Sequence, residues 1–142
     1  MKISCVNQCQ IIELDKFENR AGNLTVVQND NTIPFSIKRI YYLYDVPGKA
    51  ERGGHGHKEL YQLIVAASGS FTISLDDGTF KKSFMLNNPN KGLLIVPGIW
   101  RELSDFSSGS VCLVLASMKY AASDYIRDYQ EFLNYKNDTF II

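Results

Sequence analysis

Residues 52–62 read RGGHGHKELYQ, which places His55 and His57 one residue apart, directly after a pair of glycines. They are the two histidines of the chain. Because alternate side chains of a β-strand point to the same face, the pattern predicts two imidazoles side by side. Such a pair is typical of a metal site or of proton transfer, and the rest of the sequence has to decide between them.

Short apolar or alternating runs lie on both sides of this stretch, separated by turn signals such as RAGN, NNPN and SSG. In LDDGTF, Gly78 accepts a positive φ at little cost, which predicts a tight hairpin. Strands this short at nearly even spacing predict an all-β sandwich or barrel, not βαβ units. The predicted strands cover residues 9–14, 23–28, 37–46, 61–68, 69–77, 81–87, 91–97 and 110–117.

The C-terminal part of the chain has a different period. Over residues 123–135 the apolar side chains recur at helical spacing, and Ser123 is a suitable N-cap. We therefore expect one C-terminal amphipathic helix that lies on the sheet. The apolar positions of this helix are Tyr125, Ile126, Tyr129, Phe132 and Leu133.

Length and charge narrow the class of protein. The 142 residues fit a single domain, 1–142, and 15 basic residues balance 15 acidic ones, so neither nucleic acid nor a membrane is an expected partner. The segment MKISCVNQCQ has no signal-peptide core, and no stretch reaches transmembrane length. Cys5, Cys9 and Cys112 are odd in number and lack zinc-site partners. A reduced, cytoplasmic protein without disulfides is expected.

The spacing around the histidines is similar to the first motif of the cupins, in which a glycine, two histidines, a glutamate and a second glycine follow one another. Gly48, His55, His57, Gln62 and Gly69 take these places, with one extra residue after Gly48. The resemblance implies a double-stranded β-helix, or jelly roll, with a pocket inside the barrel. It also implies that His55 and His57 point into that pocket.

Two departures from the cupin pattern argue against a metal. Gln62 stands where the family has its glutamate ligand, and in GLLIVPGIWR the last histidine ligand is replaced by Arg101. An arginine cannot lose its proton to ligate, and its charge repels a divalent ion in the same cavity. Two histidines alone are a poor site for a biological metal. We therefore predict no metal.

Proton transfer is the second interpretation of the pair. An imidazole titrates near neutral pH, so two of them can take a proton from one carbon and return it to another. Arg101, aimed at the same space, could stabilise an oxyanion formed in between. The sequence thus favours enolisation next to a carbonyl without a cofactor. The competing interpretation is that His55 and His57 are polar residues at a strand end, satisfied by backbone and solvent.

A more specific resemblance covers nearly the whole chain. The stretches RIYYLYDVPGKAERGGHGHK, PGIWREL and DYIRDYQEFL are similar to the bacterial dTDP-sugar 3,4-ketoisomerases. This family implies the substrate dTDP-4-keto-6-deoxy-D-glucose and a 3-keto product that a PLP-dependent aminotransferase converts into a 3-amino-3,6-dideoxy sugar of surface glycans such as lipopolysaccharide O-antigen or S-layer glycan. It also implies a homodimer that exchanges N-terminal strands, here within residues 1–20.

The resemblance assigns roles to individual residues. His55 and His57 match the catalytic acid/base pair that moves a proton from C3 to C4 through an enediol(ate). Arg39 and Tyr41 match positions that line the pocket, and Arg52 and Lys58 are candidates for the diphosphate because guanidinium and ammonium groups bind phosphate oxygens. The predicted substrate-binding residues are Arg39, Tyr41, Arg52, Lys58, Gln62 and Arg101.

The family also divides by the configuration that it leaves at C4. Arg101 matches the branch with a glucose-configured product, whereas Ala21, after Arg20, fits neither branch. The glucose configuration is the expectation. Two other functions stay open: a non-enzymatic cupin that binds a nucleotide sugar, and a dTDP-sugar 3,5-epimerase, although the His–Asp dyad of that enzyme is not evident in the sequence.

Overall fold

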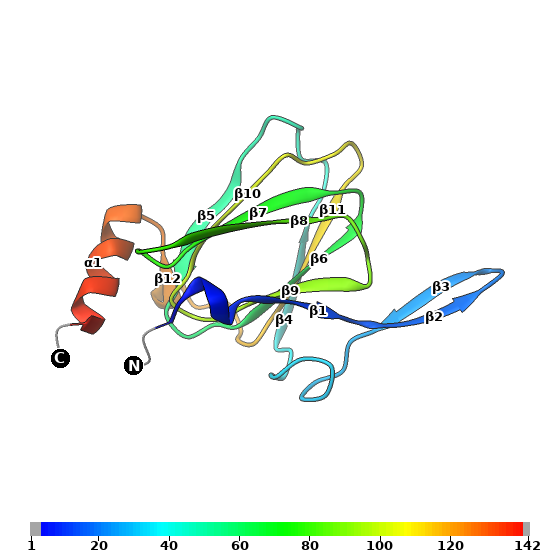
Figure 1. Cartoon of the computed structure of the whole chain (residues 1–142), viewed down its shortest axis with the longest axis horizontal. Coiled ribbons are helices and arrows are strands. Elements are labelled where there is room, and N and C mark those ends of the chain that lie inside the picture. Colours follow the sequence, from blue (N-terminus) through cyan, green and yellow to red (C-terminus); the bar gives the residue numbers. More distant parts are fainter. Residues whose placement is uncertain (1–3, 141–142) are drawn as a thin grey trace.

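Two antiparallel sheets of five strands face each other in the computed structural model, which describes residues 4–140. The first sheet has the order β1-β9-β6-β11-β4 and the second has β12-β5-β10-β7-β8 (Figure 1). The first sheet consists of β1 Gln10–Glu13, β9 Lys91–Ile95, β6 Gln62–Ser68, β11 Val111–Ala116 and β4 Arg39–Leu43. The second consists of β12 Tyr125–Ile126, β5 Arg52–His57, β10 Trp100–Ser104, β7 Phe71–Asp76 and β8 Lys81–Leu86. The predicted all-β jelly roll with one C-terminal helix is confirmed.

The core lies between the two sheets and follows the alternation of their strands. Ile64 and Ala66 of β6 face Ile73 and Leu75 of β7, and all four side chains are buried. A second cluster covers the outer face of the first sheet, where Phe35 and its neighbours from the loop after β3 pack on Leu63 and Val65. The strands β6 and β9 are therefore buried on both faces, which is why their sequences are continuous apolar runs instead of alternating ones.

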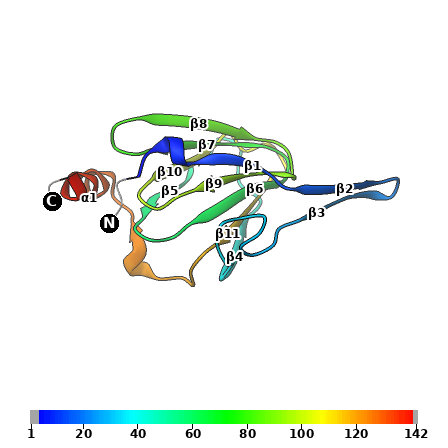
Figure 2. The ribbon, with the colours of Figure 1, turned by 60° about the horizontal axis from the view of Figure 1, so that its bottom comes forward.

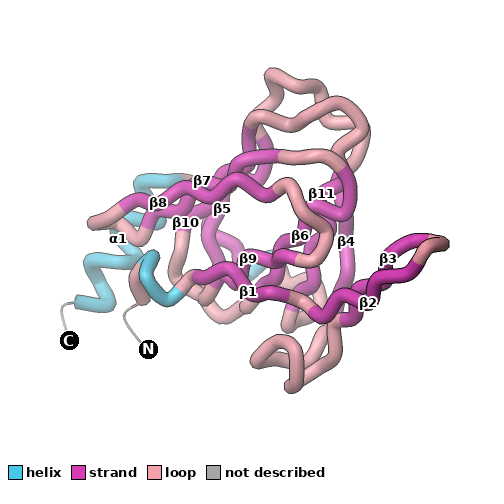
Figure 3. The backbone as a smooth tube through the Cα atoms, turned by 45° about the vertical axis from the view of Figure 1, so that its right-hand side comes forward, coloured by secondary structure: helices cyan, strands magenta, loops and turns pink. Residues whose placement is uncertain are grey.

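The view in Figure 3 looks into the barrel, with strands of both sheets arranged around its axis. The predicted hairpin at LDDGTF joins β7 to β8, with Gly78 at φ 94°. The backbone N–H groups of Gly78 and Thr79 donate to the carboxylates of Asp76 and Asp77, which fixes the turn. The prediction of this hairpin is confirmed.

A two-stranded hairpin, β2 Asp15–Asn19 and β3 Gly22–Val26, projects away from the two sheets (Figures 1 and 2). Every residue of β2 is exposed, and Phe17 pairs with Leu24 across the hairpin with about 60% of each side chain accessible to solvent. β2 escaped the sequence analysis because DKFEN has no buried face. The strand β1, just before it, pairs with β9 of its own chain, and no other described strand pairs with its second edge.

The C-terminal helix α1 spans Tyr129–Phe140 and begins later than the predicted 123–135. Asp128, not Ser123, caps it, since its carboxylate and its carbonyl accept the N–H groups of Glu131 and Phe132. Ser123 lies in a 3-10 turn, η2 Ala122–Asp124, and Tyr125–Ile126 form the strand β12. A second 3-10 turn, η1 Val6–Gln8, precedes β1.

Helix α1 packs against the end of the second sheet, at the opposite end from the hairpin (Figure 1). Phe132 is fully buried against Trp100 and Ile126, and its ring lies so close to the backbone of β5 that a Cβ at Gly56 would come within 3.2 Å of it. The Lys136 ammonium donates to the carbonyls of Ser4 and Gly98, which ties the helix to the N-terminal segment. Within the described part of the chain, no helix is long and apolar enough to cross a membrane.

Candidate active site

The strand β5 carries RGGHGH and runs antiparallel to β10, with His55 opposite Arg101. Gly53 has φ 72°, and a Cβ there would lie 2.9 Å from Arg101 Nη1. A glycine at this position therefore serves two needs, because it accepts the left-handed backbone and leaves room for the guanidinium. His55 and His57 both point into the barrel and are 8% and 2% exposed. The prediction that the two imidazoles share one face of a strand is confirmed.

The two imidazole rings meet edge to face, with ring centroids 4.8 Å apart. His57 Nδ1 lies 2.9 Å from Asp124 Oδ2, a carboxylate oxygen that comes from η2, 67 residues later in the chain. The Nε2 atoms of both histidines are buried and have no hydrogen-bond partner among the described residues. Since buried polar atoms are normally paired, these two nitrogens are the groups left for a ligand.

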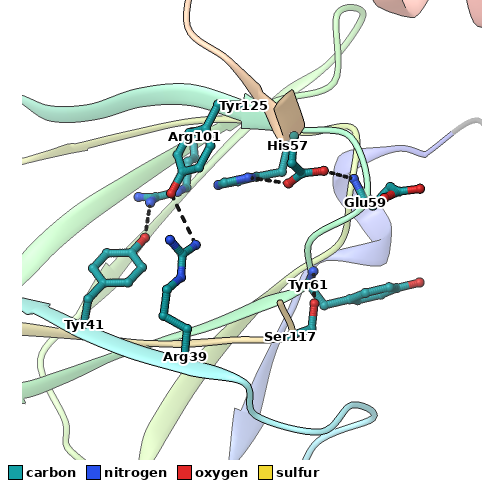
Figure 4. A network of polar contacts seen from close by, with 9 residues as sticks. Arg39, Tyr41, His57, Glu59, Tyr61, Arg101, Ser117 and Tyr125 are labelled. Atoms are coloured by element: carbon teal, nitrogen blue, oxygen red, sulfur yellow. Dashed lines mark hydrogen bonds and ion pairs between the residues drawn. The ribbon is translucent and has the colours of Figure 1, made fainter. Parts of the chain in front are cut away.

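Two tyrosine hydroxyls accept hydrogen bonds from two arginines beside the histidines (Figure 4). Arg101 Nη2 donates to the Tyr41 hydroxyl over 2.9 Å, and Arg39 Nη2 donates to the Tyr125 hydroxyl over 3.3 Å. The Tyr125 ring contacts both imidazoles, at centroid distances of 5.0 Å for His55 and 4.4 Å for His57. Arg101 is 2% exposed, and in the part of the chain that the structure describes its Nε and Nη1 atoms have no hydrogen-bond partner.

A cavity of about 340 Å³ opens in front of these groups, between the two sheets. Four arginines line it, and no described residue of its lining is Asp or Glu. A chain without net charge thus gathers positive charge around one cavity, as expected for an anionic ligand. The lining residues with polar side chains are Arg39, Tyr41, Arg52, His55, Arg101, Tyr125 and Arg127.

Both imidazoles are neutral at neutral pH. Burial, together with the adjacent charge of Arg101, lowers the pKa of His55 to about 2. Burial also lowers the pKa of His57, although the hydrogen bond to Asp124 opposes this shift. Burial raises the pKa of Tyr41, which keeps its phenol protonated. Two neutral imidazoles with free Nε2 atoms can accept protons.

These pKa shifts predict that the fold loses stability in mild acid. The unfolded chain protonates its histidines near pH 6.5, whereas the folded chain leaves His55 neutral down to about pH 2. The unfolded state therefore binds more protons below pH 6.5, and the free energy of unfolding falls as pH drops. Between about pH 7 and about pH 5 His55 alone should cost about 2 kcal/mol. Urea unfolding at both pH values measures the loss.

The double variant His55→Asn/His57→Asn is the control for this pH dependence. It removes both titrating groups, so its stability should change less over the same interval. An equally steep loss in the variant would show that other groups cause it.

The structure brings five of the predicted site residues to the cavity: Arg39, Tyr41, Arg52, His55 and Arg101. His57 lies directly behind His55, and the fully buried Gln62 begins β6 outside the cavity lining. Lys58 is placed elsewhere, because the chain turns away after β5 and its side chain lines a separate hollow with Glu131 and Asp138 of α1.

Three residues of the site escaped the sequence analysis: Asp124, Tyr125 and Arg127. They lie in the segment predicted as the start of the helix, where a buried acid next to an aromatic residue is an ordinary pattern. The His–Asp pair that the sequence did not reveal is therefore present, between His57 and Asp124.

The groups that a metal would need are not assembled here. Among residues 4–140 there is no cluster of three or more His, Cys, Asp or Glu side chains suited to an ion. Arg101 stands opposite His55 on the neighbouring strand, so a divalent ion there would meet a fixed positive charge. The residues present do not fit a metal cupin site.

Comparisons with known proteins identify the family of this chain. The family described as "FdtA: WxcM-like, C-terminal" matches residues 7–137. The chain belongs to the FdtA family. It is 42% identical over 126 residues to the TDP-4-oxo-6-deoxy-alpha-D-glucose-3,4-oxoisomerase of Aneurinibacillus thermoaerophilus. The aligned region covers 89% of this chain and 91% of that protein. The predicted resemblance to 3,4-ketoisomerases is confirmed.

Solved structures of FdtA-like isomerases have the same fold. A 3,4-ketoisomerase from Helicobacter canadensis is 47% identical, with a TM-score of 0.89 over 92% of this chain and 98% of that one. The 3,4-ketoisomerase QdtA from Thermoanaerobacterium thermosaccharolyticum, solved as a histidine-to-asparagine mutant with TDP-4-keto-6-deoxyglucose, is 37% identical, with a TM-score of 0.90 over 94% and 97%. Both relatives cover this chain almost completely.

Proposed function

We propose that the chain is a cofactor-independent isomerase that converts dTDP-4-keto-6-deoxy-D-glucose into its 3-keto isomer. The observation that carries this function is the cavity itself, where four arginines and no carboxylate surround an unpaired, neutral imidazole. A nucleotide diphosphate sugar supplies the matching negative charge, and a 4-keto sugar supplies a carbon acid for the imidazole. The Aneurinibacillus relative is named for this sugar nucleotide, and the QdtA mutant was solved in complex with it.

The reaction moves two hydrogens and needs no electron acceptor. The C3–H bond breaks, its proton goes to an imidazole Nε2, and its electron pair forms the C3–C4 double bond while negative charge collects on O4. Arg101 faces this oxygen with an unpaired Nη1 and stabilises the enediolate. The O3 proton then passes to O4 as C3 becomes a carbonyl, and C4 takes back a proton from the acid/base pair, so the product is an isomer of the substrate.

The histidines divide this work according to their position. His55 lines the cavity and takes the role next to the sugar carbons, whereas His57 lies behind it in contact with the Tyr125 ring. Their ring centroids are 4.8 Å apart, which suits proton transfer at adjacent carbons. Tyr41, held by Arg101, hydrogen-bonds the sugar oxygens.

The diphosphate is anchored by arginines at the cavity mouth. Arg52 and Arg127 are exposed and line the cavity, whereas Lys58 lies outside it. Our proposal therefore assigns diphosphate binding to Arg127 instead of Lys58. A guanidinium offers paired donors to phosphate oxygens. Arg39 is bound to the Tyr125 hydroxyl and faces the same space, with Nε unpaired. Gln62, fully buried at the start of β6 and outside the cavity lining, is given no contact with the sugar in this proposal.

In this proposal C4 of the product is protonated to the glucose configuration, because Arg101 matches the glucose-type branch of the family. A PLP-dependent aminotransferase in the cytoplasm would consume the 3-keto sugar.

The experiment that tests the function follows purified protein and dTDP-4-keto-6-deoxyglucose by proton NMR, with and without EDTA. We expect a 3-keto product whose H4–H5 coupling is large, as for two axial protons, and a rate that EDTA leaves unchanged. Inversion at C5 would identify a 3,5-epimerase, and binding without turnover would identify a sensor. A 3,5-epimerase of Bacillus anthracis is 17% identical to this chain, and a likeness at this level shows a shared fold but not a shared reaction.

We also propose a homodimer that exchanges N-terminal strands. Support comes from the projecting hairpin β2–β3, whose exposed Phe17 and Leu24 have no cover in their own chain, and from the unpaired edge of β1. Ala21 lies at the hairpin tip, away from the chain's own cavity, so its implied influence on the product requires a second subunit (Figure 1). The exchange would pair these edges isologously.

The dimer predicts a definite mass in solution. Light scattering at micromolar concentration should give twice the 16.1 kDa of one chain. Phe17→Ser/Leu24→Ser should shift the protein towards the monomer because it removes the apolar contact area. A wild-type monomer with full activity would rule the dimer out.

A further inference from the structure

The Asp124 carboxylate is fixed on both of its oxygens inside the protein. Its Oδ1 accepts the backbone N–H of Glu59 over 2.7 Å, and its Oδ2 lies 2.9 Å from His57 Nδ1. The backbone around it is fixed too, since the Asp124 carbonyl accepts the N–H of Lys58. The side chain is 5% exposed. A carboxylate held this way has no freedom to turn away from the imidazole.

This arrangement determines where His57 carries its proton. A carboxylate oxygen only accepts hydrogen bonds, so the neutral ring must keep its hydrogen on Nδ1 and present a lone pair on Nε2. Among the described residues no carboxylate pairs with His55, and Arg101 is the charge that lowers the pKa of His55 most. The two histidines are thus chemically unequal, although they occupy equivalent positions on one face of β5.

We propose that Asp124 is a positioning residue of the isomerase, which holds His57 in the Nδ1–H form and stabilises it when Nε2 takes a proton. The proposal rests on the proposed function for its kinetic part and on the structure alone for its tautomer part. A protonated His57 would share its charge with Asp124, whereas a protonated His55 would face Arg101. His57 is therefore the member of the pair that can hold the proton while the enediolate exists, after His55 has taken that proton from C3.

Substitution of Asp124 by asparagine should reverse the tautomer with little change of shape. The asparagine carbonyl keeps the Glu59 N–H, which leaves its NH₂ group facing His57 Nδ1. Nδ1 must then accept, the ring hydrogen moves to Nε2, and the lone pair needed for proton transfer is lost. The corresponding exchange in a serine protease triad lowers kcat about 10⁴-fold by the same change of tautomer.

The measurement uses the presence of only two histidines in the chain. In ¹⁵N-labelled protein at neutral pH, the His55→Asn variant shows His57 as the one remaining imidazole. We expect a protonated Nδ1 and an unprotonated Nε2 in this background and the reverse when Asp124→Asn is added. When both histidines are present, Asp124→Asn should lower kcat by about 10²-fold, which is the lower end of the range for general acid–base groups. KM should change less than kcat.

Asp128→Asn is the matched control, because Asp128 caps α1 and makes no contact with the cavity. It should reduce stability slightly and leave both the His57 tautomer and kcat unchanged. An Nε2–H tautomer in the otherwise native background would overturn the proposal, as would near-native turnover in folded Asp124→Asn. If the unsubstituted protein does not isomerise the sugar nucleotide, the proposed function is wrong. The tautomer of His57 is then tested by the ¹⁵N spectrum alone.

Discussion

Replacement of His55 by asparagine should abolish measurable isomerisation while the protein stays folded. Asparagine keeps a polar side chain in the buried site but cannot take a proton, and acid–base groups of this kind contribute about 10²–10⁴-fold to a rate. We expect His55→Asn to lower the rate by an amount at the upper end of this range, because His55 lines the cavity. His57→Asn should lower the rate less, because His57 lies behind His55. Initial rates by NMR measure both.

Deuterium exchange separates the steps that the two histidines perform. In D₂O a variant that still removes the C3 proton but cannot protonate C4 should exchange C3 without product, whereas a variant without the base should do neither. His55→Asn is expected to show no exchange. Thermal unfolding and mass in solution serve as controls for fold and assembly. Near-native turnover in both folded variants would mean that the histidines are structural.

Replacement of Arg101 by glutamine should lower kcat by about 10²–10³-fold, the usual loss when one oxyanion donor is removed. The KM for the sugar nucleotide should change much less, because Arg39, Arg52 and Arg127 remain to bind the diphosphate. The free energy of unfolding of Arg101→Gln should not fall, even though its kcat does. Arg101 is buried with two of its nitrogens unpaired, so its charge costs folding free energy that glutamine does not.

Two comparisons sharpen the Arg101 prediction. Arg101→Lys keeps the charge but loses the planar fork that reaches the Tyr41 hydroxyl, and it should recover only part of kcat. Lys82→Gln, on the exposed strand β8, removes a cation away from the cavity and should leave the kinetics unchanged. A large rise in KM with unchanged kcat in Arg101→Gln would assign this arginine to substrate binding instead of enediolate stabilisation.

Local periodicity was enough to predict the barrel and the half of the site that lies on its strands. The alternation in RGGHGH places His55 and His57 together, and the same rule places Arg39 and Tyr41 on the inner face of β4. The cupin register brought Arg101 into the same space, where it stands opposite His55. Each of these inferences needs only a strand and its direction.

The remaining part of the site depends on contacts that periodicity does not encode. Asp124 reaches His57 because η2 and β12 close over the end of β5, and 67 residues separate the two in sequence. The apolar residues at 125 and 126 fit a helix as well as a two-residue strand, so the helix was predicted to begin too early. Lys58 was assigned by its position next to the motif, but the chain turns before its side chain can reach the cavity.

The late position of Asp124 and Tyr125 in the chain also affects how the protein matures on the ribosome. Synthesis proceeds from the N-terminus at about 5–20 residues per second, so β4, β5 and β10 emerge before the segment that closes over them. Until residues 124–127 leave the exit tunnel, His57 lacks its carboxylate and the cavity lacks the Tyr125 ring and Arg127. The Lys136 contacts to Ser4 and Gly98 form later still. A nascent barrel can therefore bury most of its core before its site is assembled, and the assembly of that site is one of the last steps of folding.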